Sequence, residues 1–341
     1  MGLRMMDEAR TIGIREAMAD PAWTRDFPSA FAHPGYLAAA ARGGPAPGRP
    51  LLLEADAGGK GPTRWGLVEY AKFGFVGSAA WTEPVLAEGA DRARAWRSLL
   101  ETLRRRGHAI LRMNCVSSLR WSDDDVQAAA DAARALGARV ATSNYGTYVN
   151  DLSLSEADRF KALDESHRRK VKAAIREKLG FETLDVAAFE DYVRMSDATF
   201  ARQGIPGPSR AYLEGLRDTP SHFTFHAARN AEGVPQAVAL IAHDRGTAYY
   251  LHGGSGLRPA KGAGNWLHWA LMNHLAARGI ARYDFGGVDL RPVHGQSDGI
   301  RAFKKSFGGE FREYRAIDVV FSPVKHRLIE TGRALAAKVG L

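Results

Sequence analysis

The chain has 341 residues, which is more than one ordinary hydrophobic core needs and favours about two domains. Hydrophobic residues make up 45% and charged residues 25%, which is typical of folded globular proteins and excludes disordered and fibrous classes. The net charge of +9 indicates either a polyanionic partner (RNA, a nucleotide-linked substrate or an anionic membrane surface) or an arginine-rich enzyme without one. A single cysteine, Cys115, excludes an intramolecular disulfide, and no run of about 18 apolar residues occurs, so we expect a cytoplasmic protein without a membrane span.

Strands and helices alternate in the first half of the sequence. Two apolar runs, 51–54 and 65–70, flank a glycine- and proline-rich stretch and predict a β-hairpin. Apolar residues recur at helical spacing over 91–106 and over 123–136, and a glycine follows each run, which predicts two amphipathic helices. The run 109–113 between them predicts a short strand.

The second half repeats this plan. A basic helix is predicted from about 155 to 178, with Ser153 and Glu156 at capping-box spacing near its start. The pattern then predicts helices at 187–200, 264–278 and 323–338, strands at 224–228, 237–243, 248–252, 282–285 and 316–321, and a glycine- and lysine-rich loop at 299–310. The sequence therefore predicts an α/β (α+β) protein with two domains, 1–150 and 151–341, each a mixed, mostly antiparallel sheet flanked by helices.

Three motifs in the C-terminal half resemble a known family. They are Tyr250 with Gly253-Gly254, the segment 283–287 (YDFGG), and the segment 303–310 (FKKSFGGE) followed by Tyr314. Together they resemble the Fem family (FemA/FemB/FemX-like), whose members transfer amino acids from aminoacyl-tRNA to peptidoglycan precursors. They also resemble the overlapping BioF2-like and CelD-like GNAT acetyltransferases, whose donor is acyl-CoA. The resemblance implies two GNAT-like domains in tandem, with the catalytic cleft in the second.

The resemblance implies catalytic roles for Lys304, Phe303 and Asp284. Aminolysis of an aminoacyl ester passes through a negatively charged tetrahedral intermediate, which a lysine beside backbone N–H groups can stabilise. By resemblance Lys304 has that role and Phe303 positions the end of the tRNA. The residues alone also fit a solvated lysine pair, with Phe303 and Phe307 as core anchors four residues apart. Asp284 either acts on the substrate, by polarising the attacking amine or binding an amide, or caps the turn that follows it.

A second group of residues is expected to bind substrate. Gly286 and Gly287 permit a positive φ or close approach of a ligand, and Tyr250 either hydrogen-bonds the acceptor or packs in the core. The other expected substrate-binding residues are Arg301 and Gly308 in the last motif, and Arg169, Lys172 and Arg176 in the basic helix. The last three recur at i, i+3 and i+7, so they share a helix face that suits the phosphates of RNA or a nucleotide, although solvated surfaces show the same pattern.

The run 258–264 predicts a second anion site, at the start of a helix. GNAT enzymes bind the pyrophosphate of acyl-CoA at such a turn, so Arg258, Gly262 and Gly264 are the expected cofactor-binding residues if acyl-CoA is the donor. Their spacing departs from the GNAT pattern by one residue. The histidines show no metal-ligand or catalytic-triad spacing, and we expect no metal and no tightly bound cofactor.

The expected activity is therefore transfer of an aminoacyl group from aminoacyl-tRNA to an amine. The acceptor is either the stem peptide of a nucleotide- or lipid-linked peptidoglycan precursor or a small-molecule amine. Two alternatives stay open: an acyl-CoA-dependent GNAT N-acyltransferase, and an RNA-binding module without catalysis.

Overall fold

The computed structural model describes residues 9–24, 29–43, 48–72, 76–80, 84–85, 88–113, 122–244, 246–290 and 296–338, and Cys115 lies outside these ranges. The chain forms two compact units. The N-terminal unit comprises Met1–Asn144 and Tyr314–Leu341, and the C-terminal unit comprises Tyr145–Glu313. The division of the chain into domains at residue 150 stays a prediction.

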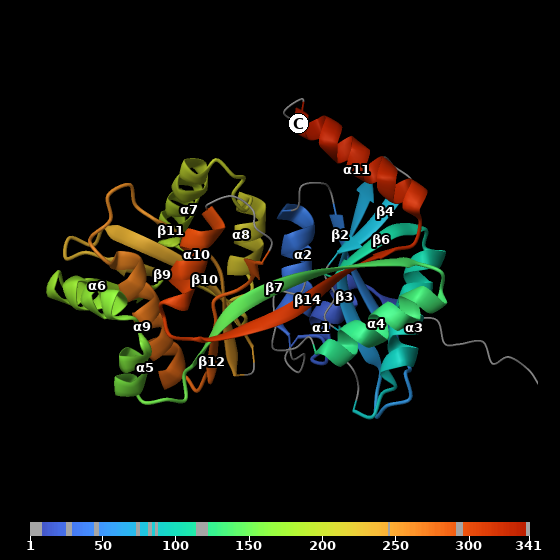
Figure 1. The fold of residues 1–341 in the computed structure, drawn as a ribbon, viewed down its shortest axis with the longest axis horizontal. Coiled ribbons are helices and arrows are strands. Elements are labelled where there is room, and N and C mark those ends of the chain that lie inside the picture. Colours follow the sequence, from blue (N-terminus) through green and yellow to red (C-terminus); the bar gives the residue numbers. More distant parts are fainter. Residues whose placement is uncertain are drawn as a thin grey trace, which may run out of the picture. The chain divides into compact units, whose positions relative to one another are not determined.

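In the N-terminal unit the strands lie in the order β1-β2-β3-β4-β6-β14, with β5 beside β3 (Figure 1). They are β1 (Arg10–Ile12), β2 (Gly48–Ala55), β3 (Thr63–Lys72), β4 (Val76–Ala80), β5 (Pro84–Val85), β6 (His108–Met113) and the part of β14 (Glu310–Val320) that belongs to this unit. The antiparallel pairing of β2 with β3 confirms the predicted hairpin. In contrast, β4 and β6 pair in parallel.

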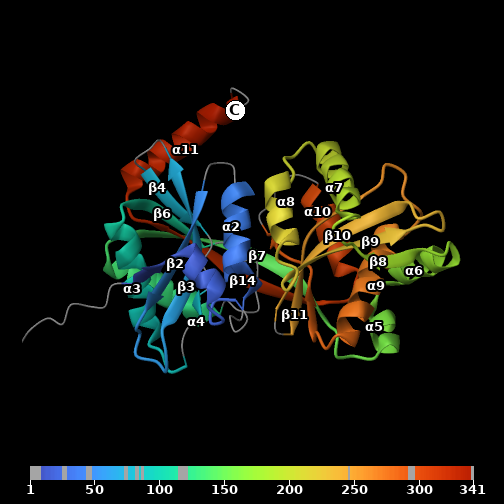
Figure 2. The ribbon, with the colours of Figure 1, turned by 180° about the vertical axis from the view of Figure 1, so that it is seen from behind.

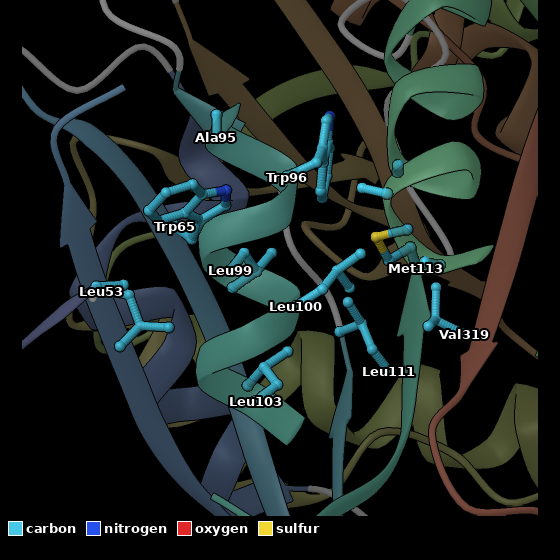
Figure 3. Close-up of a cluster of buried hydrophobic side chains, with 14 of the residues drawn as sticks. Leu53, Trp65, Ala95, Trp96, Leu99, Leu100, Leu103, Leu111, Met113 and Val319 are labelled. Atoms are coloured by element: carbon cyan, nitrogen blue, oxygen red, sulfur yellow. The ribbon is translucent and has the colours of Figure 1, made fainter. Parts of the chain in front are cut away.

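The core of this unit forms where helix α3 packs on the sheet. The helices are α1 (Ile14–Ala19), α2 (Pro34–Gly43), α3 (Arg92–Arg105), α4 (Asp123–Ala135) and α11 (Pro323–Lys338). Trp96, Leu99, Leu100 and Leu103 recur at helical spacing on α3, and they are fully buried in one cluster with Trp65 of β3 (Figure 3). At the start of α3 the Asp91 carboxylate accepts a hydrogen bond from the backbone N–H of Arg94 at 3.1 Å. Helices α3, α4 and α11 confirm the predicted ones.

In the C-terminal unit the strands lie in the order β7-β12-β11-β10-β9-β8, with β13 beside β7. They are β7 (Arg139–Asp151, of which 145–151 belong here), β8 (Gly180–Thr183), β9 (Phe223–Arg229), β10 (Pro235–Asp244), β11 (Thr247–Ser255), β12 (Arg282–Asp284) and β13 (Val288–Asp289). The β11–β12 pair is parallel, whereas the neighbouring pairs β10–β11 and β12–β7 are antiparallel. Both units thus insert a parallel pair into a mostly antiparallel sheet, as the repeated plan predicts.

Helices cover both faces of this second sheet (Figures 1 and 2). They are α5 (Glu156–Ala162), α6 (Glu165–Arg176), α7 (Phe189–Gln203), α8 (Arg210–Arg217), α9 (Ala263–Ala277) and α10 (Gln296–Lys305). Apolar residues of α6 and α9 join one core cluster with Ala237, Ala239 and Ile241 of β10. On the other face, Phe189 and Tyr192 of α7 pack edge-on against the ring of Phe225.

Three predictions about local structure in this unit are wrong. The predicted basic helix is two helices, α5 and α6, because Leu163 is extended and buried between them. Ser155, not Ser153, caps α5, by accepting a hydrogen bond from the N–H of Asp158 at 3.1 Å. The predicted loop at 299–310 begins as a helix, since α10 continues to Lys305.

The end of α10 generates a stability prediction. Gly308 has a φ of +77°, and a Cβ built on it would lie 2.1 Å from the carbonyl oxygen of Ala162 at the end of α5. Gly279 has a φ of +80°, but a Cβ there would meet nothing within 4 Å. We expect Gly279→Ala to cost about 1 kcal/mol, because alanine is strained in this conformation. Gly308→Ala should cost about 1–3 kcal/mol more, because the backbone of α5 must move.

Chemical denaturation of both variants measures this difference in the free energy of unfolding. Equal losses for the two variants would show that the close approach at Gly308 has no energetic weight.

Candidate functional site

The parallel pair β11–β12 stops pairing at the point where the predicted motifs begin. Its register covers Thr247 to Tyr249 opposite Arg282 to Asp284. From there β11 continues along β10 to Ser255, with a bulge because Leu240 pairs with His252 but Ile241 pairs with Tyr250. The bulge leaves Leu251 as an extra residue. Ligands of open sheets bind beyond the carboxyl ends of parallel strands, and Tyr250 and the segment 285–287 lie at such ends.

Asp284 is fully buried and fixes the turn that follows β12. Its Oδ1 accepts hydrogen bonds from the Thr147 hydroxyl of β7 and, at 2.8 Å, from the backbone N–H of Gly286. Gly286 has a φ of +74°, and a Cβ on it would lie 2.9 Å from the carbonyl oxygen of Tyr250. The geometry therefore shows that Asp284 caps this turn and that Gly286, but not Gly287, has a positive φ.

Lys304 reaches this turn from α10. Its Nζ lies 3.0 Å from the carbonyl oxygen of Gly286 and 3.2 Å from that of Gly287, and the residue is only 8% exposed. The backbone groups that it contacts are thus acceptors, not the N–H donors that we expected beside it. An ammonium carries three N–H donors, and the described part of the chain accepts two of them. Burial lowers the pKa of Lys304 to about 8, against the opposing effect of the Asp284 carboxylate.

Aromatic rings gather around His268, whose imidazole lies within reach of the charge of Lys304. His268 of α9 lies at the centre of this group: its ring centroid is 4.6 Å from that of Tyr250, 5.1 Å from that of Phe285 and 5.7 Å from that of Phe303. Burial, assisted by the charge of Lys304, lowers the pKa of His268 to about 3, and burial raises the pKa of Tyr250 to about 12. Both side chains are therefore neutral near pH 7, and Lys304 is the cation of the group.

Phe303 and Phe307 of the last motif pack against each other in this region. Their ring centroids are 5.1 Å apart, and Phe307 stacks on Phe285 at 4.6 Å. This arrangement is the core packing that their four-residue spacing allowed. Phe303 is only half-buried, and its proposed contact with a tRNA end stays a prediction.

Two residues of the site carry no signal in the sequence. Thr147 lies on β7, far from Asp284 along the chain, and only the pairing of β7 with β12 brings them together. His268 lies on a correctly predicted helix, where its Nδ1 is 2.8 Å from the Tyr283 hydroxyl oxygen, but a single histidine on an apolar helix has no distinguishing pattern. Strand pairing therefore reveals Thr147, and the packing of α9 on the sheet reveals His268.

The remaining predicted substrate-binding residues lie at the surface of the same unit. Arg301 is exposed, with its guanidinium 5.5 Å from the ring centroid of Phe311, and Gly287 is exposed as well. The close backbone approach expected at Gly308 is made by Ala162 of α5. A ligand-binding role for these residues stays a prediction.

The predicted basic face lies on α6. Arg169, Lys172 and Arg176 are all exposed there. Arg169 Nη1 lies 3.1 Å from Glu165 Oε1, and Lys172 Nζ lies 5.8 Å from the ring centroid of Phe160. Lys and Arg side chains with such exposed contacts can rearrange at little cost, so the face suits a polyanion.

The start of α9 differs from the start of α3. Its N-cap is Gly262, with a φ of +81° and no side-chain cap, so the first N–H groups of the helix lack a carboxylate partner. A Cβ on Gly262 would lie 2.5 Å from the carbonyl oxygen of Lys170, which packs α6 against this turn, whereas a Cβ on Gly264 would meet nothing within 4 Å. Arg258 is exposed in the preceding loop. Such a terminus attracts anions.

The described ranges contain neither a metal-ligand cluster nor a membrane-spanning helix. No group of three or more His, Cys, Asp or Glu side chains is arranged to hold a metal there. Among the same residues, no helix combines the length and apolar character needed to cross a bilayer.

Comparison with known proteins identifies the fold. Residues 161–305 match the family model described as an acetyltransferase (GNAT) domain. No curated protein matches the chain. Among solved structures, FemX superimposes with a TM-score of 0.71 at 14% identity, covering 95% of this chain and 100% of FemX.

Two other solved structures agree. The C-terminal domain of a putative lysylphosphatidylglycerol synthetase from Agrobacterium fabrum matches with a TM-score of 0.63 at 17% identity, covering 95% of this chain and 96% of that one. A tandem GNAT protein from the clavulanic acid biosynthesis pathway matches with a TM-score of 0.53 at 13% identity, covering 93% of this chain and 99% of that one. The chain therefore has the tandem GNAT-like fold of FemX, and its C-terminal unit carries a GNAT acyltransferase-type domain.

Proposed function

We propose that the protein is an aminoacyltransferase that forms an amide bond between the aminoacyl group of aminoacyl-tRNA and an amine acceptor. The observation that carries this proposal is the buried ammonium of Lys304, which is held at the carboxyl ends of β11 and β12 and makes two of its three possible hydrogen bonds with the described residues. The motif resemblance to Fem proteins, the net charge of +9 and the basic face of α6 support tRNA as the donor. The protein would meet charged tRNA in the cytoplasm.

The proposed step needs one stabilised charge. The amine nitrogen attacks the ester carbonyl carbon, and the carbonyl oxygen becomes an oxyanion that accepts the third N–H of Lys304. The intermediate collapses by breaking the bond to the tRNA ribose oxygen, which leaves with the proton that the amine loses. Asp284 does not act as the base in this scheme, because its Oδ1 already accepts two hydrogen bonds inside the protein. Its role is to hold Gly286 in place.

A second candidate is an acyl-CoA-dependent N-acyltransferase. The start of α9, which has no side-chain cap and open space beside Gly264, favours it because a pyrophosphate can accept from backbone N–H groups of such a first turn. The GNAT family match over 161–305 gives the same support.

The donor experiment separates the two candidates. The full chain is incubated with a mixture of charged tRNAs, acetyl-CoA and candidate amines, including nucleotide-linked peptidoglycan precursors, and products are identified by mass spectrometry. We expect aminoacylated amine, and no product after ribonuclease treatment. An acetylated amine that resists ribonuclease would replace the tRNA proposal by the acyl-CoA one. Specific tRNA binding without any product would favour a binding module.

Removal of the Lys304 ammonium should slow the reaction. We expect Lys304→Met to lower turnover about 10²-fold or more, as the loss of an oxyanion donor does. Lys305→Met is the matched control, because Lys305 is the exposed neighbour in the same helix. Turnover is measured with saturating donor, and circular dichroism checks the fold of each variant. Near-normal turnover of Lys304→Met would remove this lysine from the mechanism.

The role of Lys304 also predicts a pH dependence. The ammonium is present below its pKa of about 8 and is lost as the pH rises through that value. The wild-type rate divided by the Lys304→Met rate should therefore be constant below the pKa and fall towards one above it. The ratio cancels the pH effects of the acceptor amine and of ester hydrolysis. A constant ratio across the pKa would mean that Lys304 acts without its charge.

A further inference from the structure

Helix α11 of the N-terminal unit exposes an apolar stripe. Val324, Leu328 and Leu335 are 74%, 50% and 59% exposed. They are three of the eleven large apolar side chains exposed in the described part of the chain, yet α11 has only 16 residues. At about 100° per residue, the three positions fall within a sector of about 40° on the helix. Clustered exposed apolar residues mark interaction surfaces, whereas scattered ones do not.

The other side of α11 anchors the helix to the unit. Ile329 is 3% exposed and forms a small buried cluster with Ala109 of β6. Its position is about 140° around the helix from Val324. Lys325 Nζ donates to the carbonyl oxygen of Gly107 at 3.4 Å. The stripe therefore faces away from the side that holds the helix.

Cations accompany the stripe. The sequence of α11 contains Lys325, Arg327, Arg333 and Lys338, with Glu330 as the only acid. Gly107, which Lys325 contacts, follows the exposed basic turn 104–106 at the end of α3. An apolar helix stripe flanked by Lys and Arg binds bilayer surfaces through buried apolar area and attraction to anionic lipids. A 16-residue helix is about 24 Å long, shorter than the roughly 30 Å hydrocarbon core, and its charges also favour a position along the surface.

We propose that α11 docks the protein on an anionic lipid bilayer, with Val324, Leu328 and Leu335 inserted among the headgroups and the exposed Arg327 against the lipid phosphates. This occupant uses both features of the helix. A second copy of the chain would cover the stripe but oppose cation to cation, and a nucleic acid would use the cations but leave the stripe in water. The proposal is independent of the reaction at Lys304, which belongs to the other unit.

Vesicle sedimentation tests the docking. The full chain is mixed with sucrose-loaded vesicles of phosphatidylcholine, with and without phosphatidylglycerol, at low and high salt. We expect binding to the anionic vesicles, weaker binding at high salt, and little binding to phosphatidylcholine alone. Equal partitioning onto both kinds of vesicle, or onto neither, would overturn the proposal.

Paired variants locate the contact. Leu328→Glu with Leu335→Glu should lower the partition coefficient at least about tenfold, which corresponds to about 1.4 kcal/mol. Val186→Glu with Val234→Glu is the matched control, because these residues are 71% and 51% exposed in the C-terminal unit and the variant adds the same charge. The control should bind like the wild type.

Three results would contradict α11 as the docking element. One is an equal loss in both double variants, which would make net charge the sole cause. Another is a concentration-dependent dimer that the α11 variant abolishes while anionic vesicles leave the wild type unbound. The third is undiminished vesicle binding by the α11 variant. Circular dichroism of each variant confirms that the fold is retained.

Discussion

The bond between the Lys304 ammonium and the carbonyl oxygens of Gly286 and Gly287 is the interaction on which the candidate site depends. It holds α10 against the turn that follows β12. Asp284 fixes this turn by accepting hydrogen bonds from the Thr147 hydroxyl and the Gly286 N–H. Burying a cation without hydrogen-bond partners costs free energy, and the two carbonyl oxygens reduce that cost. Burial still lowers the pKa of the ammonium. The arrangement joins β7, β12 and α10 through polar groups in a region otherwise built from aromatic rings.

The neutral imidazole of His268 leaves Lys304 as the cation of that region. Burial lowers the pKa of His268 to about 3, so the imidazole is neutral near pH 7 and Lys304 is the cation beside it. The imidazole therefore fills space beside the ammonium without competing with it for an anion. Its Nδ1 contact with the Tyr283 hydroxyl fixes the ring, so the position of the charge does not depend on small changes in acidity.

Patterns within one element were sufficient to predict most of the fold. The helices at 91–106, 123–136, 264–278 and 323–338 and the strands around them were predicted because their apolar residues repeat with a regular period. The break at Leu163 was missed because neither glycine nor proline marks it, and the burial of this leucine between α5 and α6 is a tertiary feature. The contact of Lys304 with carbonyl oxygens, and the role of Thr147, were missed because both depend on which strands pair, which no local pattern records.

The two units differ at the start of one helix. The helix between the two parallel strands has Asp91 as its N-cap in the N-terminal unit and Gly262 in the C-terminal unit. In the first, a built-in carboxylate neutralises the helix end and would repel a phosphate. In the second, that end keeps its attraction for anions. The two units have similar backbones, but the N-cap residue makes the start of α9 suitable for a phosphate group and the start of α3 unsuitable. A phosphorylated ligand would therefore favour the C-terminal unit.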